Sequence, residues 1–122
     1  METGLTYSST VQVNSTNTAL ALGSGDIEVF ATPALVALME NAAMNAVKPV
    51  LPEGSTTVGA MIQTSHLKPS GLNEEVTATA ELTEIEGRKL TFKVSASDSK
   101  GLVGEGTHIR YIVDRERFLS KL

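Results

Sequence analysis

The spacing of the hydrophobic residues changes once along the chain, and this change constrains the fold more than any other feature. Residues 31–47 space their apolar side chains as a helix does, whereas the residues after 55 alternate apolar and polar side chains as strands do. Turns that contain glycine separate the alternating segments. We therefore predict one long helix followed by strands with tight connections. The predicted strands are residues 56–67, 75–85, 89–97 and 102–114, with an earlier strand near residues 5–13.

The predicted helix begins at a Thr-Pro pair and ends at a Lys-Pro pair. Thr32 is a suitable N-cap because its hydroxyl can accept a backbone N–H, and Pro33 fits the first helical position, where its N–H would be unpaired in any case. Pro49 disfavours helical geometry in Lys48 before it. The stretches "LGSGDIE" and "LPEGS" are predicted to be irregular connections, and the last residues, "DRERFLSKL", a short helical turn.

One helix cannot cover both faces of such a sheet, so one face should be in contact with water. The simplest architecture is α+β, an antiparallel sheet wrapped around one long central helix, which is the hotdog fold. The 122 residues are enough for one such domain, spanning 1–122, and leave no room for a second. A single copy would expose sheet edges and apolar surface, so we expect a homodimer or a dimer of dimers.

Composition argues against several classes of function. The net charge is −4 and no run of basic residues occurs, so we expect no nucleic-acid partner. The chain has no cysteine and only two histidines, which argues against disulfides, thiolate catalysis and a structural zinc site. The N-terminal residues lack the pattern of a signal peptide, and the longest apolar run is too short and too polar to cross a bilayer. We expect a cytoplasmic protein with no membrane partner, no metal and no cofactor.

Glu40 is the only charged residue between Glu28 and Lys48. On a helical wheel of about 100° per residue it falls on one flank of the apolar arc, where a carboxylate is partly desolvated. The residues alone leave two interpretations of this carboxylate open, a structural ion pair and a functional group.

His66 ends the predicted strand 56–67, and strict alternation directs it towards the helix. The residues placed on the same face are Val58, Ala60, Ile62 and Thr64. A lone histidine on an apolar face is usually a packed core residue. Together with Thr32 and Glu40, however, it would supply a hydroxyl, a base and an orienting group.

Three stretches of the chain resemble the fluoroacetyl-CoA thioesterase-like branch of the hotdog thioesterases. They are "VFATPALVALMENAA", "LPEGSTTVGAMIQTSHLKPSG" and "EIEGRKLTFKVSASDSKGLVGEGTHIRYIV", and they extend from about Val29 to Phe118. The resemblance implies that Thr32, Glu40 and His66 are the catalytic set. It also implies that the substrate-binding residues are Gly59, His66 and Arg110.

The same resemblance implies an acyl-CoA thioesterase, which hydrolyses an acyl-CoA to free acid and coenzyme A, so that the coenzyme is part of the substrate. No aromatic residue lies between Tyr7 and Phe30, so the aromatic lid of the specialised fluoroacetate-resistance enzyme is absent, and we expect hydrolysis without fluoroacetyl selectivity. A short acyl group is expected from small side chains, which are Gly59, Ala60, Ala34 and Ala37.

Basic residues could meet the phosphates of coenzyme A, and the candidates are Lys48, Lys68 and Arg110. Surface charge is the simpler role for both lysines. Arg110 is predicted to be partly buried because it shares a strand face with Leu102 and Ile112. His108 lies on that face too, where a structural role is the simpler interpretation.

The sequence leaves the mechanism open between attack by Thr32, attack by Glu40 and attack by a water molecule that a base activates. Two other functions also stay open. One is a non-catalytic acyl-CoA binding or sensor protein. The other is a hotdog hydratase or dehydratase, which ranks lower because no aspartate lies near His66 in the sequence.

Overall fold

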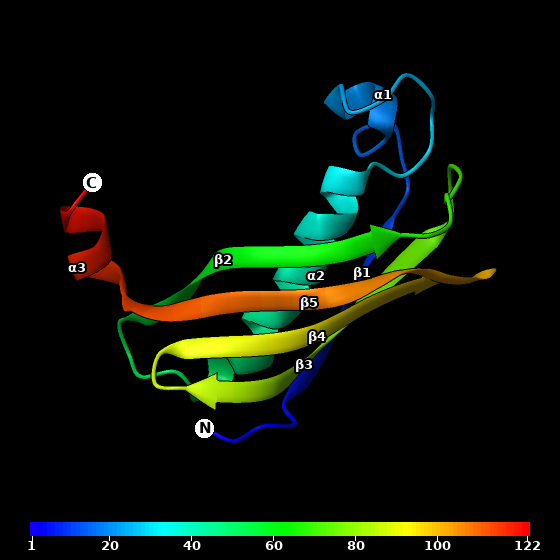
Figure 1. Ribbon diagram of the computed structural model, residues 1–122. Helices are drawn as coiled ribbons and strands as arrows, with labels where there is room; N and C mark the ends of the chain where they lie inside the picture. Colours follow the sequence, from blue (N-terminus) through cyan, green and yellow to red (C-terminus); the bar gives the residue numbers. More distant parts are fainter.

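A computed structural model of residues 1–122 contains five strands, one long helix and two short ones (Figure 1). The long helix and all five strands were predicted, and each lies within one residue of its predicted bounds. The elements are β1 (Thr6–Gln12), α1 (Ala19–Leu22), α2 (Thr32–Val47), the 3-10 turn η1 (Lys48–Val50), β2 (Ser55–His66), β3 (Glu75–Glu86), β4 (Lys89–Asp98), β5 (Gly101–Asp114) and α3 (Arg115–Ser120).

The five strands form one antiparallel sheet in the order β1-β3-β4-β5-β2, and the sheet curls around α2 (Figure 1). The core lies between α2 and the inner face of the sheet. As alternation predicted, β3 and β4 bury every second side chain. Those buried side chains are Val76, Ala78, Ala80, Leu82, Leu90, Phe92, Val94 and Ala96.

A β-bulge in β2 changes which residues face the helix. Gly59 pairs with Arg110 of β5, but the next pair is Met61 with Ile109, so Ala60 is an extra residue in β2. The predicted alternation is therefore wrong before the bulge. Val58 lies on the outer face, whereas Gly59 lies on the inner face together with His66.

A second bulge lies in β5, because Ala96 of β4 pairs with Gly104 and the following residue, Ser97, pairs with Leu102. The extra residue, Val103, is fully buried, and Leu102 is 43% exposed. The prediction that Leu102 shares a face with Arg110 is therefore wrong, since one inserted residue reverses the face of every residue on its far side.

The short helix α1 lies in a segment that was predicted to be irregular. The Thr18 hydroxyl accepts the backbone N–H of Ala21, and Gly23 ends the turn with a φ of 74°. One turn of helix carries too few residues for a periodic signal, so only its capping residues indicate it.

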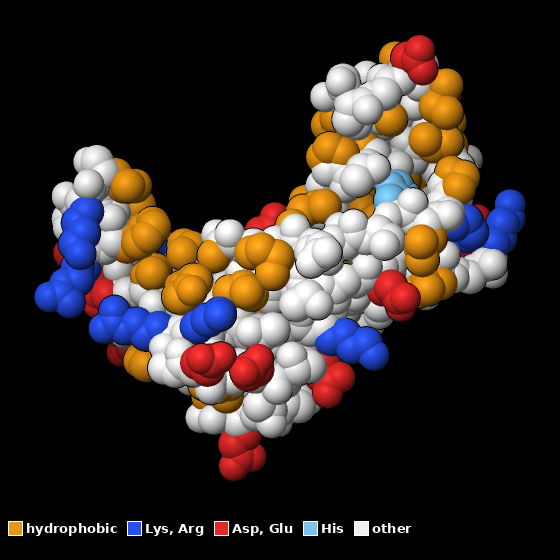
Figure 2. All heavy atoms as spheres, in the orientation of Figure 1, with side chains coloured by type: hydrophobic (Ala, Val, Ile, Leu, Met, Phe, Trp, Pro, Cys, Tyr) orange, Lys and Arg blue, Asp and Glu red, His pale blue; other side chains and the backbone are white.

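Strand β2 is an edge strand, so its outer backbone groups are unpaired within the chain. Figure 1 shows α1 and α3 at opposite ends of this edge, and Figure 2 shows a concave surface between the two ends that is lined with hydrophobic side chains. None of the helices has the length and hydrophobicity of a transmembrane span.

Candidate active site

The N-terminus of α2 presents Thr32 to the end of β2. Thr32 Oγ1 lies 2.8 Å from His66 Nδ1, and the two residues are hydrogen-bonded. The prediction that Thr32 is the N-cap is wrong. The Leu35 N–H donates to the Ala31 carbonyl, so the helix starts one residue earlier, and Ala31 is the N-cap. The Thr32 hydroxyl therefore makes no cap hydrogen bond and contacts the His66 imidazole instead.

Backbone contacts bring these two segments together. The N–H of Phe30, just before α2, donates to the carbonyl of Ser70, just after β2, at 2.9 Å. The Leu67 N–H donates to the Val103 carbonyl at 2.7 Å, which holds the end of β2 on β5. These contacts of the flanking segments thus fix the positions of Thr32 and His66.

Thr32 and His66 line an open hollow of about 250 Å³. Its other lining residues are Ala19, Ser24, Val29, Phe30, Leu67, Lys68 and Pro69. The Thr32 side chain is exposed, whereas His66 is half-buried. His66 Nε2 is buried and has no hydrogen-bond partner within the chain. A buried ring nitrogen without a partner is costly for stability, and this cost is typical of a functional site.

Burial lowers the pKa of His66 below its ordinary value of 6.5. The backbone of Lys68 opposes this shift, and the positive charge of Lys68 reinforces it. The imidazole is therefore mostly neutral at pH 7, which is the form that can accept a proton from the Thr32 hydroxyl.

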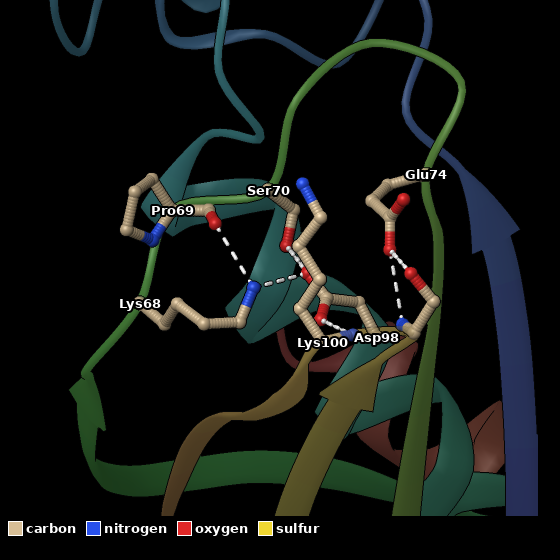
Figure 3. Close-up of polar contacts among 7 residues, drawn as sticks. Lys68, Pro69, Ser70, Glu74, Asp98 and Lys100 are labelled. Atoms are coloured by element: carbon tan, nitrogen blue, oxygen red, sulfur yellow. Dashed lines mark hydrogen bonds and ion pairs between the residues drawn. The ribbon is translucent and has the colours of Figure 1, made fainter.

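A buried carboxylate fixes the chain that follows β2 (Figure 3). Asp98 Oδ2 accepts from Lys68 Nζ at 2.5 Å and from Ser70 Oγ at 2.7 Å, and the Asp98 side chain has no exposed surface. Asp98 Oδ1 accepts from the backbone N–H of Lys100 at 2.8 Å. Lys68, a candidate for phosphate binding, is thus engaged in an ion pair, and the loop beside His66 is tied to the β4–β5 turn.

Glu40 does not reach this hollow in a single chain. It follows Thr32 by eight residues on α2, which corresponds to about 12 Å along the helix axis. Its partner is Arg110, since Glu40 Oε2 lies 3.5 Å from Arg110 Nη1. The structure therefore brings Thr32 and His66 together and places Glu40 in a second cluster.

Gly59 belongs to the second cluster. A Cβ at Gly59 would lie 2.6 Å from Glu40 Oε2, so only the absence of a side chain leaves room for the carboxylate. Arg110, which is 6% exposed, was predicted to be partly buried. Burial lowers the pKa of its guanidinium and the charge of Glu40 raises it. Because Arg110 is buried against Glu40, it does not face solvent as a phosphate ligand would.

Two further polar residues complete this cluster: Thr57, which sequence reasoning missed, and His108, which it placed on the same strand face as Arg110. Arg110 Nε donates to Thr57 Oγ1 at 2.8 Å, and Arg110 Nη2 donates to the Thr57 carbonyl at 2.9 Å. Arg110 Nη1 lies 3.3 Å from His108 Nε2. Thr57 was missed because strict alternation from His66 assigns it to the outer face.

The small side chains do not gather as predicted. Ala34 and Ala37 line a different depression beside β1, and Ala60 is exposed in the bulge. Gly59 lies against Glu40, a predicted site residue.

Residues 13–116 of the chain match the protein family described as the fluoroacetyl-CoA-specific thioesterase FlK. The chain belongs to the fluoroacetyl-CoA-specific thioesterase family. A relative in this family, the fluoroacetyl-CoA thioesterase of Streptantibioticus cattleyicolor, is 41% identical over 95 residues, which are 78% of this chain and 68% of the relative. The predicted class of enzyme, a thioester hydrolase, is confirmed by this membership.

Solved structures of FlK thioesterase superpose closely on the chain. One has a TM-score of 0.92 at 35% identity and covers 99% of this chain and 94% of the FlK chain. A thioesterase superfamily member from Thermus thermophilus has a TM-score of 0.90 at 24% identity, covers 98% of this chain and 89% of its own, and shows the shared fold. The predicted hotdog fold is confirmed.

Proposed function

We propose that this chain hydrolyses a short-chain acyl-CoA, with Thr32 as the nucleophile and His66 as the proton carrier. The observation that carries the proposal is the 2.8 Å contact between Thr32 Oγ1 and His66 Nδ1 at an open hollow. Acyl transfer needs a nucleophile, a base and donors for an oxyanion. The N-terminus of α2 supplies the donors, because the first N–H groups of a helix have no partner inside it.

In the proposed reaction Thr32 Oγ1 attacks the thioester carbonyl carbon while its proton passes to His66 Nδ1. The carbonyl oxygen becomes an oxyanion beside the N-terminus of α2. When the carbon–sulfur bond breaks, His66 returns the proton to the sulfur of coenzyme A. A water molecule then attacks the acyl-Thr32 ester with His66 as its base, which releases the acid and restores the hydroxyl.

The proposal includes a homodimer, because the imidazole lacks an orienting group within its own chain. Glu40 is about 12 Å away along α2, whereas β2 has a free edge. If two β2 edges pair antiparallel about a two-fold axis at residue 63, with Ala60 left unpaired in the bulge of each strand, Gly59 of the partner subunit faces His66. Glu40 lies over Gly59, so the partner's Glu40 would lie about one strand spacing, ~4.8 Å, from the imidazole.

Such a dimer would give His66 Nε2, which is buried without a partner, a carboxylate to which it can donate. The hydrophobic side chains along the concave edge would be buried by the same association (Figure 2). The proposal thus assigns Glu40 the role of orienting His66 in the other subunit.

The size of the hollow supports a short acyl group. Two of its lining residues, Ala19 and Ser24, are small and come from the segment around α1 that contains no aromatic residue. This wall gives no reason to require a fluorine atom on the acyl group. Because acyl-CoA thioesters are made inside cells, the proposal places the protein in the cytoplasm.

The first experiment measures the release of coenzyme A thiol from acetyl-, fluoroacetyl-, butyryl- and octanoyl-CoA. We expect turnover of the short substrates and loss of turnover in Thr32→Val, which keeps the shape of the side chain and removes the hydroxyl. Tight binding without thiol release would favour a sensor protein. Addition of water to an enoyl-CoA without thiol release would favour a hydratase.

The second experiment tests whether the site is shared between the two subunits, with two variants of strongly reduced activity, His66→Gln and Glu40→Gln. A mixed dimer of these two chains contains one intact site, because the Thr32 and His66 of the Glu40→Gln chain meet the intact Glu40 of the other. After unfolding and refolding together in equal amounts, we expect about one quarter of the wild-type activity. A site formed within one chain predicts no recovery of activity in the refolded mixed dimers, and that result would contradict the proposal.

A further inference from the structure

We propose that Thr57 and His108 are positioning residues that aim the guanidinium of Arg110 at Glu40. This inference rests on the proposed function, in which Glu40 orients the catalytic histidine of the other subunit. It adds two residues on β2 and β5 that touch neither the substrate nor His66 and act only through Arg110.

Thr57 fixes the plane of the guanidinium. Its hydroxyl accepts from Arg110 Nε at 2.8 Å and its carbonyl accepts from Nη2 at 2.9 Å. A planar group that is held at two of its nitrogens by a single residue cannot rotate. The remaining nitrogen, Nη1, is thereby directed at Glu40 Oε2 at 3.5 Å and at His108 Nε2 at 3.3 Å.

The His108 ring can accept a hydrogen bond from Arg110 only when it is neutral with its hydrogen on Nδ1. The backbone at the bulge in β2 favours that state. His108 Nδ1 lies 2.7 Å from the Met61 carbonyl oxygen, which can only accept, so Nδ1 carries the hydrogen. Nε2 of the neutral ring is then an acceptor for Arg110 Nη1. Met61 is the first paired residue after the bulge at Ala60, where the ladder is interrupted.

The surroundings of His108 favour the neutral ring. Burial lowers its pKa below 6.5, and the charge of Arg110 lowers it further, against opposing effects of the Met61 carbonyl and of Glu40. His108 is 1% exposed, and its ring lies beside Phe92 with the ring centroids 6.2 Å apart. The imidazole is therefore a fixed acceptor and not a second cation beside Arg110.

Arg110 contacts Glu40 but leaves its carboxylate partly exposed to solvent. Its side chain is 40% exposed, and its contact with Arg110 is 3.5 Å, longer than an ordinary hydrogen bond. Oxygen lone pairs of the carboxylate thus remain available to a donor from outside the chain. Arg110 is buried, but the acid that it contacts is partly exposed and lies beside the free edge of the sheet.

The test uses two matched pairs of variants. Thr57→Val removes the hydroxyl and keeps the side-chain shape, and Thr57→Ser restores the hydroxyl. His108→Gln places an amide oxygen near the position of Nε2, whereas His108→Asn places an amide N–H near the position of Nδ1. If His108 acts through Arg110, the Gln variant retains more activity than the Asn variant, and a residue that only supports the bulge predicts the reverse order.

We expect Thr57→Val to lower kcat by about 10- to 100-fold with little change in KM, because an orienting contact is lost and substrate binding is not. Thr57→Ser should remain close to the wild type. The decisive measurement is a double-mutant cycle with Glu40→Gln. If Thr57 acts only through Glu40, Thr57→Val causes no further loss of kcat in that background. If the double variant instead loses kcat by the product of the two separate effects, the inference is overturned.

A readout without activity separates this inference from the proposed function. The Arg110 Nε–H should give a slowly exchanging NMR signal in the wild type and in Glu40→Gln, and a rapidly exchanging one in Thr57→Val. An unchanged signal in Thr57→Val would overturn the positioning role. A wild type that releases no thiol from any acyl-CoA, with the expected NMR changes, would overturn the proposed function instead.

Discussion

The carboxylate of Glu40 occupies the space that a side chain at Gly59 would need. An ideal Cβ at position 59 would lie 2.6 Å from Glu40 Oε2, and the next nearest atoms belong to Arg110 and His108 at 3.5 Å. The neighbour that must move is thus the end of a flexible side chain. A methyl group at this position would change where the carboxylate points more than it would disturb the fold.

Gly59→Ala is therefore expected to separate activity from stability. We expect kcat to fall by about 10- to 100-fold because Glu40 is displaced from Arg110, while the free energy of unfolding changes by less than about 1 kcal/mol. Steady-state kinetics and urea denaturation check the two values. Gly106→Ala is the contrasting control, since a Cβ there would clash with the backbone of Gln63 and should destabilise the fold. A large loss of stability in Gly59→Ala would contradict the prediction.

Substitutions of Thr32 should follow the hydroxyl and not the size of the side chain. Thr32→Ser should keep activity within about tenfold, and Thr32→Val should lower kcat by about 100-fold or more, because His66 then has no proton to accept. Stability should change by less than about 0.5 kcal/mol, since Thr32 is exposed and makes no cap hydrogen bond. Equal activity of the Val and Ser variants would contradict a nucleophilic or proton-donating role for Thr32.

The pH dependence of activity should report His66. Within one chain burial lowers its pKa below 6.5, whereas in the proposed dimer the partner's Glu40 opposes this shift, because a nearby carboxylate stabilises the imidazolium. The Glu40→Gln variant removes the opposing charge, so the acid-side midpoint of its kcat/KM should lie below 6.5 and below that of the wild type. In that variant the unfolded chain binds more protons near pH 6.5 than the folded chain does, so His66 should destabilise the fold as the pH falls through that range. An acid-side midpoint in Glu40→Gln at or above that of the wild type would contradict the prediction.

Asp98 should govern stability in acid. Burial by itself would raise the pKa of Asp98, but hydrogen bonds from Lys68, Ser70 and the Lys100 backbone outweigh this effect and lower the pKa to about 2. The contribution of Asp98 to the free energy of unfolding should be complete above pH 3.8, its ordinary pKa, and should be lost as the pH falls through about 2.

Asp98→Asn should lower the midpoint of thermal unfolding by several degrees at pH 7 and by much less at pH 2, because Asp98 is about half protonated at its pKa of about 2 and most of its contribution to stability is lost there. Calorimetry at the two pH values checks this difference. The Ser70→Ala variant, which removes one of the hydrogen bonds, should show a smaller effect in the same direction. An equal effect of Asp98→Asn at both pH values would contradict the assignment.

The secondary structure could be predicted closely because its causes are local. The apolar spacing of residues 31–47 and the alternation after residue 55 follow directly from helix and strand geometry. Prolines and glycines mark where these elements end. The single-turn helix α1 was missed, since four residues show no period.

The candidate site could be predicted only in part. Thr32, Glu40 and His66 were named from chemistry and resemblance, but the sequence did not reveal that Thr32 pairs with His66 while Glu40 pairs with Arg110. Thr57 was not found, because one extra residue at Ala60 places it on the inner face.

The sequence by itself determined the elements, their order and the kinds of functional group available, because hydrophobic period and turn chemistry act over a few neighbouring residues. Only the tertiary structure decided which of those groups meet. Strand pairing between β2 and β5 sets the register, and a bulge leaves no mark in the periodicity strong enough to locate it. The contacts between Thr32 and His66 and between Glu40 and Arg110 join residues far apart in the chain, so their geometry exists only once the sheet has closed around the helix.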